Sequence, residues 1–332
     1  MILNRDVVRE VIKLASNPKK MYHYIWSLVY WYFRPLIKWF LHRTTQMCEL
    51  QRICYGEPTG ARRIIAVEGS LRQSRNMDIK SLVSHLDTLS DRREITNKTE
   101  RSILEEAIRT VLVTKKINPI AHPDFARSFG KCVELIWGYR QLCVQAEEIR
   151  KTPYDADNSE HEMLLLKLWN LLMPQESLEG RVTKQWKDIG FQGDDPKTDF
   201  RGMGVLGLEN LVYFAEEYPS AAKHVLSHSS HPRYGYAFAI VGINLTSMAL
   251  RLLRDGSAKT HIFNVSKTLP TIRVFHQFYC YLIYEFDRFW IESKPSNMME
   301  FSSIQEKFEN SIRIALSNPK TIFRINISVD NV

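Results

Sequence analysis

From about residue 77 onward, apolar residues recur at intervals of three and four along most of the chain. This spacing lines up an apolar stripe on one side of a helix and is typical of amphipathic helices packed on a core. Helices are predicted near residues 103–112, 132–143, 163–172, 205–217, 236–254, 274–292 and 297–316, and proline or glycine follows several of them.

Alternation of the kind that strands show is nearly absent, and its best example is Phe323 to Val329 near the C-terminal end. No segment repeats at a fixed period, which excludes solenoid folds. With 332 residues and 44% hydrophobic content, the chain can fill a sizeable core. We therefore predict an all-α fold with short connections, a helical body over residues 77–318 and a C-terminal tail over residues 319–332.

The positive charge of the chain is concentrated near its beginning. The net charge is +8, and residues 1–63 carry eleven Lys/Arg against four Asp/Glu, which is +7 of that total. A basic surface spread over the folded body, as nucleic-acid binding requires, is therefore not expected. The five cysteines include no CxxC pair, which favours reduced thiols and a cytoplasmic location.

Nine aromatic residues fall between Tyr22 and Phe40, and basic residues flank them. Trp and Tyr favour the headgroup zone of a bilayer, but the run from Met21 to Phe33, which lacks Lys, Arg, Asp and Glu, is 13 residues long. A helix that spans a bilayer needs about 20 residues. We interpret residues 1–55 as a membrane-associating segment whose residues 20–45 contact the membrane surface peripherally or monotopically. A helix packed on the body through its aromatic face is the alternative, and a tilted span is a third possibility.

Residues 56–76 mix Gly, Pro, Ser and Arg without sustained periodicity, so we predict a linker there. Residues 1–16 carry a short amphipathic pattern of Val, Ile and Leu among charges.

Several motifs that could carry chemistry are incomplete. Residues 202–207 match GxGxxG, but no strand precedes them, so close approach between helices explains the glycines better than a dinucleotide does. His224, His228 and His231 have helical spacing, yet Val225 stands where a zinc protease has Glu. We interpret them as solvated histidines and expect no metal and no cofactor. A GxSxG nucleophile motif is also missing.

Arg201 stands where a polar loop turns into an apolar helix. It could form a bidentate ion pair with Asp195 or Asp199 that fixes the loop. It could instead point outward at the phosphates of a partner, with Asp195, Asp199 and Gln192 holding it, as an arginine finger does. The residues alone leave both possibilities open.

The stretch from Trp186 to Leu211 resembles the ELMO domain of the engulfment-and-cell-motility superfamily. Its members share WxxxGFQxxDPxTDxRGxGxLGLxxL, and every fixed position of that pattern is present here. The resemblance covers roughly residues 20–315 and is strongest to the small members with a single ELMO domain, which would occupy about residues 130–318.

This resemblance implies a GTPase-activating protein for Arf and Arf-like small GTPases in their GTP form, in which Arg201 is the required residue. Gln192, Asp195 and Asp199 would orient Arg201, while Gly202 and Gly204 would let the partner approach closely. The chain would contribute to the partner's reaction and have no turnover of its own. The alternative is a non-catalytic ELMO-type scaffold that mediates protein assembly at membranes.

Overall fold

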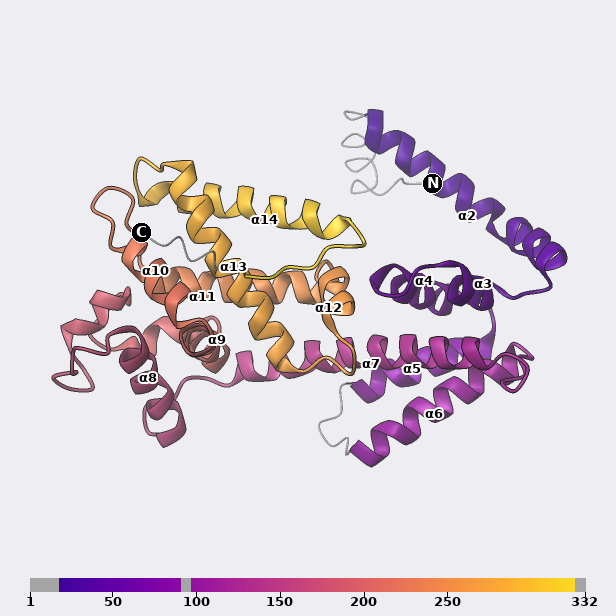
Figure 1. Ribbon diagram of the computed structural model, residues 1–332, viewed down its shortest axis with the longest axis horizontal. Coiled ribbons are helices and arrows are strands. Elements are labelled where there is room, and N and C mark those ends of the chain that lie inside the picture. Colours follow the sequence, from indigo (N-terminus) through magenta and orange to yellow (C-terminus); the bar gives the residue numbers. More distant parts are fainter. Residues whose placement is uncertain (1–17, 91–96, 326–332) are drawn as a thin grey trace, which may run out of the picture. The chain divides into compact units, whose positions relative to one another are not determined.

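A computed structural model describes residues 18–90 and 97–325, and these form helices and connecting loops without any strand (Figure 1). The predicted all-α fold is thus confirmed over the described ranges. The chain divides into two compact units, Met1–Gly56 and Glu57–Val332. The amphipathic pattern of residues 1–16 lies outside the described residues.

The first unit consists of helix α2 (Pro18–Thr45) and helix α3 (Glu49–Gly56). Glu49 at the start of α3 forms ion pairs with Arg34, at 3.1 Å, and with Lys38, at 2.5 Å, which tie the two helices together. Aromatic side chains of α2 are exposed, including Trp26 and Tyr32 at 61% and 75%. None of the described helices combines the length and the apolarity that a bilayer span requires.

The second unit begins with α4 (Ala61–Arg72), α5 (Met77–Ser90) and α6 (Asn97–Thr114), which pack around α7 (Pro123–Lys151) (Figure 1). Helix α4 occupies the segment predicted to be a linker, so that prediction was wrong. Ile64 and Val67 are buried, and Glu68 forms a 2.7 Å ion pair with Lys259. Three glycines and a proline around α4 obscured its short apolar stripe in the sequence.

The other helices of this unit gather around α9 (Gly204–Glu217), which contacts α7, α8, α10, α11 and α13. Leu206, Leu208, Leu211 and Phe214 of α9 are fully buried. A helix that is apolar on nearly all sides in this way can only be stable at the centre of a domain. The helices that surround it or follow it are α8 (Ser159–Leu172), α10 (Pro219–Ser229), α11 (Phe238–Arg254), α12 (Lys259–Val265), α13 (Ile272–Ser293) and α14 (Phe301–Ser317).

The segment after α14 forms no strand in its described part. Phe323 instead packs its ring on Tyr281, with centroids 4.3 Å apart, and its backbone N–H donates a 3.1 Å hydrogen bond to Nδ1 of His261. The tail is therefore packed on the domain up to Phe323, while residues 326–329 of the predicted alternating stretch lie outside the described residues.

Candidate functional site

Arg201 lies in the long connection between α8 and α9, which contains two short 3₁₀ helices, η1 (Lys184–Ile189) and η2 (Pro196–Arg201). It is the last residue of η2, and its side chain is exposed. Within the described ranges, the side chain of Arg201 forms neither a hydrogen bond nor an ion pair. Its guanidinium is thus available to another molecule.

A buried aromatic cluster fixes the backbone directly under Arg201. The preceding residue, Phe200, is 1% exposed, so its burial holds the end of η2 against the domain. Neighbouring rings of the cluster lie between 5.2 and 5.8 Å apart, mostly edge to face or tilted, as aromatic pairs prefer. In order of contact, the cluster consists of Trp169, Trp186, Phe191, Phe200 and Tyr154.

Arg181 joins the two sides of the loop. Its guanidinium contacts Asp195 at 2.9 Å and Glu162 at 2.5 Å, and the Tyr154 hydroxyl also donates a hydrogen bond to Glu162. Partial burial raises the pKa of Asp195, but hydrogen bonds from the Lys197 backbone and from Arg181 outweigh this and leave its pKa below the ordinary value. Asp195 is therefore an ionised part of the loop frame.

Neither aspartate forms a hydrogen bond or ion pair with Arg201 in the described residues, so of the two possibilities that the sequence left open, the ion pair that fixes the loop is not the one observed. Asp195 caps η2 by accepting a hydrogen bond from the Lys197 N–H at 2.9 Å. Asp199 accepts one from the Gln192 backbone N–H, also at 2.9 Å. Both carboxylates satisfy backbone donors near η2, as capping residues do. Any orienting effect that they and Gln192 have on Arg201 therefore acts through the backbone.

The glycines after Arg201 have different surroundings. Gly202 is exposed, and a Cβ built on it would meet nothing within 4 Å. Gly204 is buried with φ of +55°, and a Cβ there would lie 2.3 Å from the carbonyl oxygens of Arg150 and Thr152. Gly204 therefore serves close approach to the end of α7, where the Val205 N–H donates to Thr152 at 2.9 Å. The prediction that Gly204 adjoins a partner was wrong, whereas Gly202 has open space on its surface.

The histidines of α10 are only partly solvated, contrary to the prediction. His224 is exposed, but Nδ1 of His228 lies 2.7 Å from Oδ2 of the buried Asp287. Burial raises the pKa of Asp287, and hydrogen bonds from Tyr236 and His228 partly oppose that shift. His231 stands apart and accepts backbone hydrogen bonds through Nδ1.

Comparison with known proteins assigns the chain to a family. Residues 144–305 match the ELMO/CED-12 family. ELMO domain-containing protein 2 of Bos taurus is 47% identical over 294 residues, which is 88% of this chain and 95% of that protein. ELMO domain-containing protein 1 of Mus musculus is 45% identical over 301 residues, covering 85% of the chain and 88% of that protein. The chain belongs to the ELMO/CED-12 family.

The region matched to the ELMO/CED-12 family begins inside α7 and ends inside α14. It contains the whole loop with Arg201 and the cluster around Asp287. Helices α4, α5 and α6 precede it but belong to the same compact unit. A relative in Dictyostelium discoideum, ELMO domain-containing protein B, is 33% identical over 83% of this chain and 93% of its own length.

Sequence reasoning missed the residues that frame the ELMO loop, namely Arg181 and Glu162. Arg181 precedes the recognised pattern by five residues, and Glu162 lies 19 residues before Arg181 on another element. Acidic and basic residues are common on helix surfaces, so nothing in the sequence distinguishes Arg181 and Glu162 from other charged residues near the loop.

Proposed function

We propose that the chain is a GTPase-activating protein for Arf-family small GTPases and that it supplies Arg201 in trans as an arginine finger. One observation carries the proposal: Arg201 is an exposed arginine without a partner in the described residues, on a short helix whose neighbouring residue is buried. An arginine that served the fold would be paired, as Arg181 is.

The chemistry follows from the charge that phosphoryl transfer creates. As water attacks GTP, negative charge develops on the oxygens around the γ-phosphate, and the GTPase itself holds the phosphates and Mg²⁺. A planar guanidinium can donate two parallel hydrogen bonds to such oxygens, whereas an ammonium acts as a point charge. Arg201 would thus stabilise the transition state more than bound GTP, which is the condition for a higher rate.

The surroundings of Arg201 suit this role. The buried ring of Phe200 and the cap by Asp195 hold the backbone of η2 before the partner arrives, so little ordering of the backbone is left for the moment of binding. Gly202 offers no side chain next to the finger, so the partner's surface can approach the backbone there.

A single-turnover assay with GTP-loaded Arf-family GTPases and the Arg201→Lys variant tests the proposal. Such a finger accelerates hydrolysis by about 10³–10⁵-fold, or ~4–7 kcal/mol of barrier. Because lysine keeps the charge and loses the planar fork, we expect most of that acceleration to disappear while the melting temperature stays unchanged. Arg127→Lys, on an arginine of α7 whose side chain is 81% exposed, is the matched control and should behave like the wild type.

The non-catalytic scaffold gives a different result in the same assay. In that case the wild-type chain would bind its partner without accelerating hydrolysis. An Arg201→Lys variant that accelerates hydrolysis as well as the wild type would show that the chain activates without this arginine, and loss of activity that follows unfolding of the variant would show Arg201 to be structural. Each of these three outcomes rejects the finger.

We also propose that the first unit holds the chain at the cytoplasmic face of a membrane through α2. Trp39 and Phe40 are 64% and 59% exposed, and the basic Arg43 is exposed in the last turn of the same helix. Aromatic rings at the headgroup level and cations near anionic lipid together stabilise such contact. Removal of residues 1–45 should abolish flotation with anionic liposomes and spare GTPase activation in solution, and flotation that survives would reject this role.

A further inference from the structure

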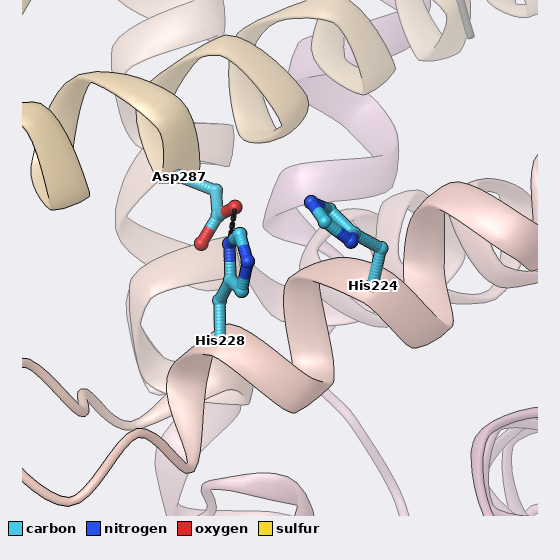
Figure 2. Close-up of side chains that lie close together, drawn as sticks. All are labelled: His224, His228 and Asp287. Carbon is cyan, nitrogen blue, oxygen red and sulfur yellow. Dashed lines mark hydrogen bonds and ion pairs between the residues drawn. The ribbon is translucent and has the colours of Figure 1, made fainter. Parts of the chain in front are cut away.

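Two neighbouring histidines and one aspartate that is distant in the sequence converge between α10 and α13. His224 and His228 are one turn apart on α10, and Asp287 of α13 points at them from the facing helix (Figure 2). Their ligand atoms all lie within 4.8 Å of one another. The two imidazole rings are 4.0 Å apart between centroids.

We propose that His224, His228 and Asp287 form a binding site for a divalent transition-metal ion, with Zn²⁺ as the best fit. Two histidines at a spacing of four on one helix face are the arrangement that helical zinc sites use. Two imidazoles and one carboxylate make up a common three-ligand zinc set in which water takes the fourth position. Because His224 is exposed, solvent can reach the fourth coordination position of the ion.

The distances require only small movements. Zinc bonds of about 2.0–2.1 Å place tetrahedral ligands ~3.4 Å apart. His228 and Asp287 are now 2.7 Å apart and would separate slightly, with the ion taking the place of the hydrogen that they share. The ring of His224 already points toward His228 and Asp287 (Figure 2), and rotation of this exposed side chain would bring its ligand nitrogen to the ion.

The surroundings of Asp287 support a cation at this place. Its side chain is 3% exposed, and within the described residues it forms no ion pair with Lys or Arg. A buried carboxylate without a cation is costly, so a metal ion would supply the charge that the fold lacks. The Tyr236 hydroxyl donates a 2.6 Å hydrogen bond to Oδ1 of Asp287 and thereby holds the carboxylate in a fixed orientation, as outer-shell groups of metal sites do.

A metal ion at His224, His228 and Asp287 differs from the prediction of solvated histidines without metal. His231, the third histidine of the sequence pattern, is not part of the site, because its Nδ1 is occupied by the N–H groups of Arg233 and Tyr234. The aspartate that completes the site follows His228 by 59 residues.

Titration of the full, tag-free and metal-stripped chain with Zn²⁺ by calorimetry, and with Co²⁺ by visible absorption, tests the proposal. We expect one equivalent to bind, the absorption of tetrahedral cobalt to appear, and the melting temperature to rise by several degrees, on the order of 5 °C. His224→Ala removes an exposed ligand and should fold normally. It should weaken binding by more than about a hundredfold, because even outer-shell changes cost 10–100-fold.

His85→Ala is the matched control, since His85 is an exposed histidine on α5 outside the cluster. It should bind as the wild type does. Tyr236→Phe should weaken binding by about tenfold, which a purely structural hydrogen bond to Asp287 would not do. A wild-type chain that fails to bind one equivalent, or a His224→Ala variant that binds as tightly, overturns the proposal. Arg201→Lys should retain full metal binding, so the metal site and the finger succeed or fail separately.

Discussion

The loop between α8 and α9 contains two arginines with opposite surroundings. Arg181, which with Glu162 and Asp195 forms what we call the base of the loop, has a side chain that is 27% exposed and contacts two carboxylates. Arg201 at the end of η2, which we call the tip, is exposed and pairs with no carboxylate in the described residues. The base uses its cation to hold the loop in shape. At the tip, the guanidinium of Arg201 has no partner in the described residues, and only the backbone under it is fixed.

This difference between the two arginines predicts that substitutions of Arg181 and of Arg201 affect different properties of the chain. Removing Arg181 would leave Glu162 and Asp195 facing each other without a cation, and a partly buried group that loses its partner is costly to the fold. Removing the side chain of Arg201 takes no hydrogen bond or ion pair from the described part of the domain. Changes at the base should therefore lower the free energy of unfolding, and if the proposed function holds, changes at the tip should alter the reaction of the partner.

The largest effect on stability is expected where the tip joins the end of α7, at Gly204. The left-handed backbone costs a non-glycine residue about 1–2 kcal/mol. A Cβ 2.3 Å from two carbonyl oxygens would also force α9 away from α7. We expect Gly204→Ala to lower the free energy of unfolding by about 3–5 kcal/mol, as measured by urea denaturation.

Gly202→Ala is the matched control for this substitution. Gly202 has φ of −80° and open space around it, so alanine should leave the unfolding midpoint unchanged or raise it slightly. If Gly202→Ala nevertheless slows GTPase activation, the loss belongs to contact with the partner. Equal destabilisation by both substitutions would contradict the difference between Gly202, which has open space around it, and Gly204, which is packed on the end of α7.

The fold was largely predictable because burial leaves a periodic trace in the sequence. Helices α8, α11, α13 and α14 fall where apolar residues recur at three and four, since each presents one face to the core, and the central helix α9 falls in the most continuously apolar stretch. Helix α4 escaped prediction because its apolar stripe is only twelve residues long and lies among turn-forming residues. Phe323 looked like part of a strand, but tertiary packing on Tyr281 decides its conformation.

The candidate site was predictable only in part. Arg201 could be picked out because it stands at the change from polar loop to apolar helix, and its surroundings support the outward orientation. Which cation pairs with Asp195 could not be read from the sequence, because Arg181 reaches it across the loop from 14 residues away. Asp287 joins the histidines through the packing of α13 on α10, which local spacing does not encode.

At the base of the loop, Arg181→Met should lower the free energy of unfolding by about 1–3 kcal/mol. Methionine keeps much of the length and removes the hydrogen bonds to Glu162 and Asp195. Thermal denaturation should show a drop of several degrees, together with a modest loss of GTPase activation, because Arg201 would then be held less firmly. Arg127→Lys serves as the control, and an Arg181→Met variant as stable as the wild type would mean that the base does not depend on its ion pairs.

The smallest effect concerns the charge of Asp195. Its pKa in the folded chain is lowered, so its contribution to stability is present above the unfolded pKa of about 3.9 and is lost as the pH falls from there through the folded pKa. Asp195→Asn keeps an oxygen that can cap η2 and removes the charge. At neutral pH we expect the free energy of unfolding of the wild type to exceed that of this variant by about 1 kcal/mol or less, because the side chain of Asp195 is 39% exposed. This difference in free energy should shrink below pH 4. A difference that stays constant down to pH 3 would show that the cap, and not the ion pair with Arg181, is what Asp195 contributes to the base.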